Sequence, residues 1–160
     1  MSGQPVTSAS LRLNHSLEAG ERARFLIVDD EPALLRAMRR VLHAAGPNWA
    51  VVCARHGVEA LECLSHEPFD AVLLDLHMPV MDGITLLRHL VAQYPEVRRI
   101  VHSSHIDPIG RGVLAELAHE VLAKPAHPAS IVDALERSLR RGATPVRASG
   151  PVVARKTSTC

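Results

Sequence analysis

The sequence is short of cysteine, aromatic residues and net charge, and each shortage excludes a class of protein. Its 3 cysteines fit neither a metal knuckle nor a secreted disulfide framework, so we expect a reduced, cytoplasmic protein. Aromatic residues make up 2% of the chain, and the formal net charge is +1. This composition predicts no nucleic-acid partner. No apolar run approaches the roughly 20 residues of a membrane span, so no membrane partner is expected either.

Short aliphatic runs alternate with amphipathic segments along the middle of the chain. The runs are continuous rather than alternating in polarity, which is typical of strands covered on both faces. Each is followed by apolar residues at helical spacing, although the segment 107–119 contains a proline and two glycines and is expected to be short or mobile. This alternation predicts an α/β fold, a doubly wound parallel sheet of five strands. The expected strands are 25–29, 50–55, 71–75, 99–103 and 121–124.

We expect one domain, over residues 23–141. Residues 1–22 are polar and have no sustained period, which predicts a flexible N-terminal arm. Residues 142–160 contain no acidic residue and no useful period, which predicts a disordered tail rather than a second domain.

Polar side chains follow four of the five predicted strands. Asp29 and Asp30 come after the first and Asp75 after the third, with Ser103 and Lys124 ending the last two. Ligands of open parallel sheets bind at the carboxyl ends of strands, so we expect these groups to converge. Carboxylate oxygens without paired Cys or His favour Mg²⁺ over zinc, and together with a hydroxyl and an ammonium they suit a phosphoryl group. For any single residue, a polar cap at a loop is an alternative explanation.

Lys124 stands out further, because the chain has two lysines against 16 arginines. A sequence with this preference that retains lysine at one strand end suggests that a compact point charge is required there. The pair His102 and His105 is spaced too loosely for a metal site, and we expect a core or surface role for it.

The same positions resemble the signature of the receiver domain of two-component response regulators, over about residues 24–141. The motifs that carry the resemblance are Asp29-Asp30-Glu31-Pro32, Asp75 followed by Met78-Pro79 and Met81-Asp82-Gly83, then Ser103, and Lys124-Pro125. The resemblance implies a flavodoxin-like receiver fold with the strand order 2-1-3-4-5.

The resemblance also implies roles for individual residues. Asp75 would accept a phosphoryl group from a sensor histidine kinase or a histidine phosphotransfer protein. Asp30 would bind Mg²⁺ directly and Asp29 mostly through water, with Asp75 and the backbone carbonyl of His77 as further metal ligands. The chain would catalyse its own phosphorylation and dephosphorylation, and is therefore not expected to be an enzyme acting on other substrates.

Two further residues complete the implied site. Lys124 would neutralise charge during phosphoryl transfer, and Ser103 would move to hydrogen-bond the new phosphoryl oxygens and so switch binding of a downstream protein. The resemblance also implies that the chain can form a homodimer through its last two helices. We expect a stand-alone receiver or a phosphorelay intermediate.

The chain departs from the receiver pattern at Val121, where receivers usually carry Tyr or Phe three residues before the lysine. A short, branched side chain changes little exposed area by rotating, so an aromatic switch is not expected here. Two alternatives stay open. One is an enzyme that uses Asp75 as a covalent nucleophile on small substrates, although no insertion supplies a lid. The other is a receiver-like interaction module that functions without phosphorylation.

Overall fold

Strands and helices alternate strictly in the computed structural model, which describes residues 22–140. The predicted tail and the predicted arm, apart from Arg22, lie outside this range. No helix within it is long and apolar enough to cross a membrane. The elements are β1 (Arg24–Val28), α1 (Pro32–Ala45), β2 (Ala50–Ala54), α2 (Gly57–His66), β3 (Ala71–Leu74), α3 (Gly83–Gln93), β4 (Arg98–Ser103), α4 (Pro108–Leu117), β5 (Glu120–Ala123) and α5 (Pro128–Arg140).

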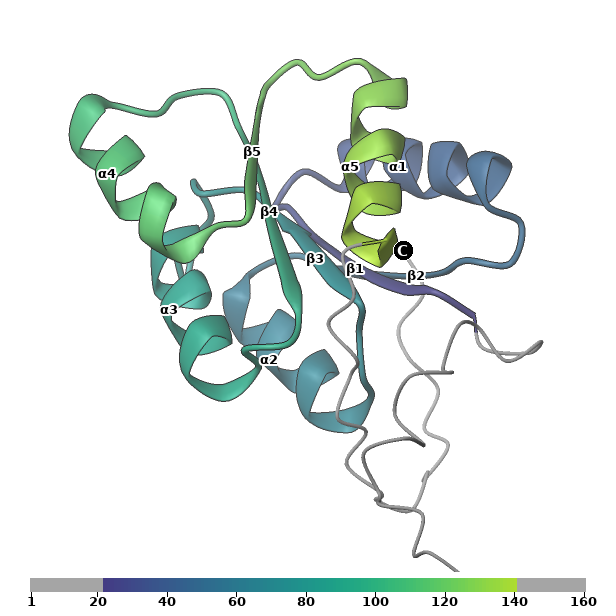
Figure 1. Cartoon of the computed structure of the whole chain (residues 1–160), viewed down its shortest axis with the longest axis horizontal. Coiled ribbons are helices and arrows are strands. Elements are labelled where there is room, and N and C mark those ends of the chain that lie inside the picture. Colours follow the sequence, from purple (N-terminus) through teal and green to yellow (C-terminus); the bar gives the residue numbers. More distant parts are fainter. Residues whose placement is uncertain (1–21, 141–160) are drawn as a thin grey trace, which may run out of the picture.

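The strands form one parallel sheet in the order β2-β1-β3-β4-β5, which confirms the predicted doubly wound fold. Helices α1 and α5 cover one face, and α2, α3 and α4 cover the other (Figure 1). The chain adds β2 on one side of β1 and β3 on the other, so the strand order reverses between β1 and β3. That reversal places a ligand-binding crevice at the carboxyl ends of these two strands.

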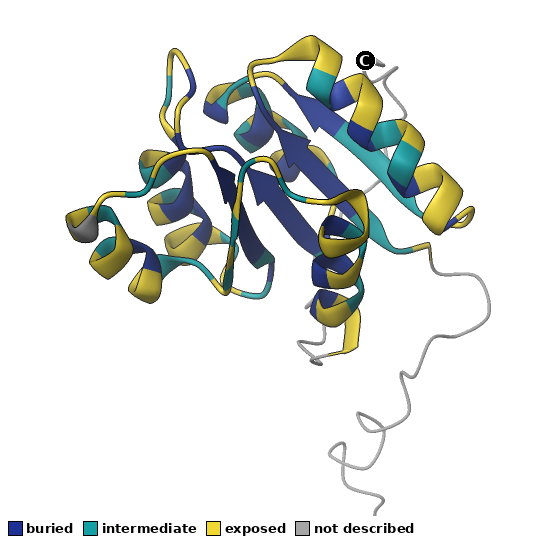
Figure 2. Ribbon diagram, turned by 90° about the horizontal axis from the view of Figure 1, so that it is seen from above, coloured by how far each residue is buried: buried dark blue, intermediate teal, exposed yellow. Residues whose placement is uncertain are grey.

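Two apolar clusters, one on each face, pack the helices onto the sheet. Successive strand residues face opposite sides, so Phe25 and Ile27 of β1 contribute to the cluster under α1 and α5, whereas Leu26 and Val28 contribute to the cluster under the other helices. Every residue of β3 is buried, and the helices turn their exposed faces outward (Figure 2). This two-sided cover explains why the strand sequences are continuously apolar.

Strand β5 departs from the predicted burial on both faces. Its residues alternate between intermediate and exposed, and Val121 is 42% exposed. Val121 and Ala123 pair in register with Val101 and Ser103 of β4. A groove of about 830 Å³ runs between this side of β5 and helix α4. Because β5 is an edge strand that α4 does not fully cover, its apolar residues remain partly in solvent.

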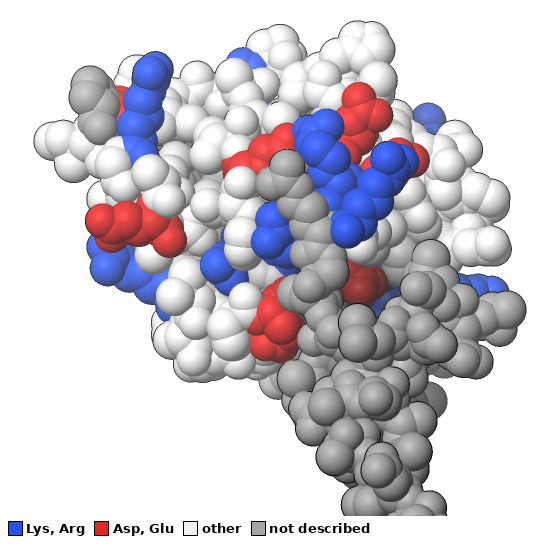
Figure 3. Space-filling view, viewed as in Figure 1, with Lys and Arg blue, Asp and Glu red and all other residues white. Residues whose placement is uncertain are grey.

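Charges on the face shown in Figure 3 are mixed in sign, with basic side chains close to acidic ones. Two ion pairs involve exposed arginines of α5: Arg137 pairs with Glu120 of β5, and Arg140 pairs with Glu136 of the same helix at 3.3 Å. Such exposed pairs add little stability. The mixture of basic and acidic side chains on this face agrees with the formal net charge of +1.

Candidate functional site

Backbone hydrogen bonds place two carboxylates at the point where the strand order reverses. The Asp29 N–H donates to the Ala54 carbonyl at 3.1 Å, and the Asp75 N–H donates to the Val28 carbonyl at 2.9 Å. The strand pairing therefore continues one residue beyond β1 and β3. This extension holds Asp29 and Asp75 side by side on the rigid sheet edge.

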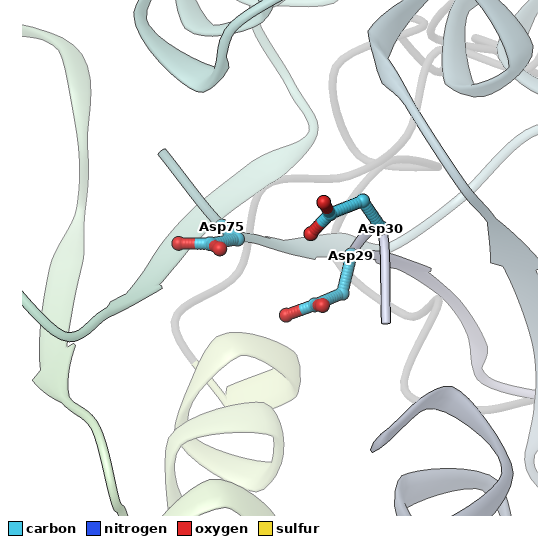
Figure 4. A group of neighbouring side chains, drawn as sticks. All are labelled: Asp29, Asp30 and Asp75. Carbon is cyan, nitrogen blue, oxygen red and sulfur yellow. The ribbon is translucent and has the colours of Figure 1, made fainter. Parts of the chain in front are cut away.

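Asp29, Asp30 and Asp75 form an acidic cluster there (Figure 4). One oxygen from each carboxylate lies within 4.8 Å of the others. Asp29 is 3% exposed and Asp75 is 7% exposed, whereas Asp30 faces solvent. Three carboxylates, with no thiolate or imidazole among them, offer the hard oxygen donors that Mg²⁺ prefers. The donor set therefore fits the predicted metal and brings together three of its four predicted ligands.

Lys124 bridges the two buried carboxylates. Its Nζ lies 2.7 Å from Asp29 Oδ2 and 3.1 Å from Asp75 Oδ2. The other oxygen of each carboxylate accepts a backbone N–H, from Glu31 at 2.9 Å and from Leu76 at 2.7 Å. Both carboxylates are thus held by a backbone amide and by the shared ammonium of Lys124.

The charge of Lys124 is stabilised by this arrangement. Burial alone lowers a lysine pKa, but hydrogen bonds and charge interactions with Asp29 and Asp75 outweigh it and raise the pKa of Lys124. The ammonium therefore stays charged at neutral pH, as the predicted role requires. Its backbone N–H donates to the Ser103 carbonyl at 2.9 Å, which ties the end of β5 to the end of β4.

Ser103 joins the site indirectly. It is 1% exposed, and its Oγ lies 3.3 Å from His77 Nδ1 and 3.5 Å from the His105 carbonyl. His77 is exposed and follows Asp75 by two residues on the β3–α3 loop. The hydroxyl therefore connects the loops after β3 and β4, and its partner His77 lies two residues past Asp75.

The Asp-Gly pair at the start of α3 has a steric explanation. Asp82 caps the helix by accepting the Thr85 N–H, and the Gly83 N–H donates to the Leu76 carbonyl at 2.9 Å. A Cβ atom at Gly83 would lie 2.3 Å from the Asp75 carbonyl oxygen, a contact with rigid backbone. Only glycine allows α3 to begin this close to the residue that carries the candidate acceptor carboxylate.

His102 was expected to be a core or surface residue, and it is a core residue beside the site. It is 4% exposed, and its Nε2 has no partner among the described residues. Burial, followed by the charge of Lys124, lowers its pKa, while Asp29 and Asp75 oppose the shift. An apolar strand with one histidine does not show which face that histidine occupies, so the sequence leaves the choice between core and surface open.

Comparison with known proteins agrees with this geometry. The chain is 32% identical over 134 residues to the transcriptional regulatory protein AruR of Pseudomonas aeruginosa, covering 80% of this chain and 54% of AruR. It is 36% identical over 104 residues to the sensor protein TorS of Escherichia coli, covering 64% of this chain and 11% of TorS. The chain thus spans about half or less of these two curated relatives.

A solved structure gives the same result for the fold. The signal receiver domain of an HD domain-containing protein from Pseudomonas fluorescens Pf-5 matches with a TM-score of 0.70 at 27% identity, covering 75% of this chain and 96% of that one. Residues 25–136 match the response regulator receiver domain family, which confirms the resemblance seen in the motifs. The chain therefore belongs to the receiver domain family of two-component response regulators.

Proposed function

We propose that Asp75 accepts a phosphoryl group from a histidine of a sensor kinase or phosphotransfer protein, and that this modification switches binding of a downstream protein. The observation that supports the proposal is the position of Asp75, a buried carboxylate that lies beside the carboxylates of Asp29 and Asp30 and pairs with Lys124. A carboxylate with a purely structural role would not need two more carboxylates within 4.8 Å, because like charges this close repel each other.

In the proposed reaction an oxygen of Asp75 attacks the phosphorus atom of a phosphohistidine. The new O–P bond forms as the P–N bond breaks, and the electron pair stays on the imidazole nitrogen, which takes up a proton. The Leu76 N–H fixes the carboxylate orientation, and the Lys124 ammonium reduces the repulsion between the carboxylate and the incoming phosphoryl oxygens. Mg²⁺, when bound, supplies further charge neutralisation, with Asp29, Asp30, Asp75 and the His77 carbonyl as its ligands.

Ser103 is proposed to carry the change away from the site. Its hydroxyl contacts His77 and His105, and a phosphoryl group on Asp75 competes for that hydroxyl. Release of the His77 contact would shift the connection between β4 and α4, which borders the groove beside Val121. Phosphorylation would thereby alter the surface offered to a partner without an aromatic side chain at position 121.

Intact-mass spectrometry after incubation with acetyl phosphate and Mg²⁺ tests the proposal. We expect one added phosphoryl group on the wild type, and none on Asp75→Asn or in the presence of EDTA. Addition to Asp75→Asn at the same level as the wild type would place the acceptor elsewhere. A single, stoichiometric addition also separates a phosphoacceptor from an enzyme that turns over small substrates.

The exposure of Val121 favours one second candidate, an interaction module that functions without phosphorylation. In that case a partner would bind the wild type and Asp75→Asn equally, and beryllofluoride with Mg²⁺ would leave the amide spectrum unchanged. The proposed switch instead requires beryllofluoride to shift resonances around Ser103.

A further inference from the structure

A second cavity lies on the opposite face of the sheet, between α1 and α5. Its volume is about 420 Å³, within the roughly 300–1,000 Å³ range of small-molecule sites. Exposed Ala37 of α1 and Pro128 of α5 border it, and Leu42 and Ile131 line it from the buried side of these helices. The cavity therefore extends from the surface toward the sheet.

One buried polar group has no partner at this cavity. His102 projects from β4 to the same face as Ile100, the side covered by α1 and α5, and lines the cavity. Its Nε2 is buried and lacks a hydrogen-bond partner among the described residues. A buried, unpaired ring nitrogen is costly to leave unsatisfied, which points to a group that the cavity admits.

We propose that this cavity, which we call the α1–α5 pocket, binds a small molecule with an apolar body and one uncharged hydroxyl, an alcohol or a phenol, whose hydroxyl pairs with His102. Nine of the twelve lining residues are apolar, which suits the body of such a ligand. Nε2 is buried, so the imidazole turns toward the hydroxyl when the ligand fills the pocket.

The chemistry of His102 and Lys124 favours a hydroxyl over a charged group. Burial keeps the imidazole neutral at pH 7, so Nε2 is a donor in one tautomer and an acceptor in the other, and a hydroxyl can pair with either. Lys124 also lines the pocket, but its ammonium already bridges Asp29 and Asp75. An anion would compete with those carboxylates, and a cation would be repelled by the lysine. The proposal does not depend on phosphorylation of Asp75.

The test titrates the ¹⁵N-labelled full chain with 4-propylphenol and with 4-propyltoluene, which differ in one hydroxyl replaced by a methyl group. Two variants separate the hydrogen bond from the apolar contacts: His102→Phe removes the pairing group, and His102→Gln retains one. Ala37→Trp fills the entrance from an exposed helical position. Ala44→Phe enlarges an exposed residue of the same helix outside the pocket and is the matched control.

We expect saturable amide shifts along α1 and α5, with the phenol binding about fivefold more tightly than the toluene, the effect of one hydrogen bond. His102→Phe should abolish this preference and His102→Gln should retain it. Ala37→Trp should abolish binding of both compounds, and Ala44→Phe should leave both unchanged.

Three results would overturn the proposal. The first is the absence of saturable binding to the wild type, which needs no variant to fold. The second is equal affinity for the two compounds, or a preference that persists in His102→Phe. The third is a concentration-dependent shift of the same resonances without ligand, accompanied by dimers in sedimentation velocity, which would assign the pocket to a second copy of the chain.

Discussion

Replacement of Lys124 by methionine should destabilise the protein strongly when divalent metal is absent. The ammonium lies 2.7 Å from Asp29 Oδ2 and 3.1 Å from Asp75 Oδ2, and the lysine side chain is only 19% exposed. Methionine keeps most of the apolar stem but leaves two buried carboxylates without their shared counter-charge. The change therefore tests the electrostatics of the site rather than its packing.

The distances set the magnitude. At an effective dielectric constant of about 20, the two attractions amount to about 6 and about 5 kcal/mol. Desolvation of the three groups offsets much of this gain, and removal of one partner from a buried ion pair typically costs about 3–5 kcal/mol. We expect Lys124→Met to lower the free energy of unfolding by an amount in that range.

Urea unfolding in EDTA, followed by circular dichroism, measures the loss. Arg137→Met, which breaks the exposed pair with Glu120, is the matched control and should have a far smaller effect. Excess Mg²⁺ should stabilise Lys124→Met more than the wild type, because the metal then binds the carboxylates without a competing ammonium. A loss below about 1 kcal/mol in EDTA would refute the reasoning, since it would mean that water already solvates both carboxylates.

Three further predictions concern the surroundings of the site. Gly83→Ala should destabilise by roughly 1–3 kcal/mol in urea unfolding, because its Cβ meets the Asp75 carbonyl, whereas Gly112→Ala, with open space around it, should not destabilise. Val80 is 79% exposed and has a φ of 70°, in the left-handed region that Asn adopts more readily than a branched side chain. Val80→Asn should therefore raise the unfolding free energy by about 1 kcal/mol. An unchanged or lower value would mean that this backbone is not strained. The pKa of His119 is lowered to about 4, by burial first and then by nearby arginines, so the free energy of unfolding should fall as pH decreases from 6.5 toward 4. His119→Asn should flatten this pH dependence of the unfolding midpoint. An equal slope in the variant would show that His119 does not cause it.

The sheet could be predicted from the local pattern of apolar residues, and the acidic cluster could then be predicted from the ends of the strands. Continuous apolar runs marked the strands, and the rule that parallel strands end at one edge brought Asp29, Asp75 and Lys124 together. The boundaries of all five strands differ from the predicted ones by about one residue. Because all five strands are parallel, their carboxyl ends lie at one edge of the sheet, as the prediction requires.

The exposed side of β5 and the pairing of Ser103 with His77 could not be predicted in this way. The exposure of Val121 depends on how far α4 extends over an edge strand, and an apolar run does not contain that information. The Ser103 contact depends on the path of the β3–α3 loop, whose His77 lies 26 residues earlier in the chain. Both are consequences of tertiary packing.

The end of β4 shows how one strand serves two sites. Ser103 points to the face that carries α3 and α4 and contacts His77, whereas His102, one residue earlier, points to the face that carries α1 and α5 and lines the α1–α5 pocket. Lys124 follows the neighbouring strand and takes part in both the acidic cluster and the pocket lining. A ligand in the pocket would therefore touch the residue that balances the charge of Asp75. Because strand residues alternate with a period of two, a one-residue shift of β4 would exchange the two faces, so the register of this strand determines which side chain serves which site.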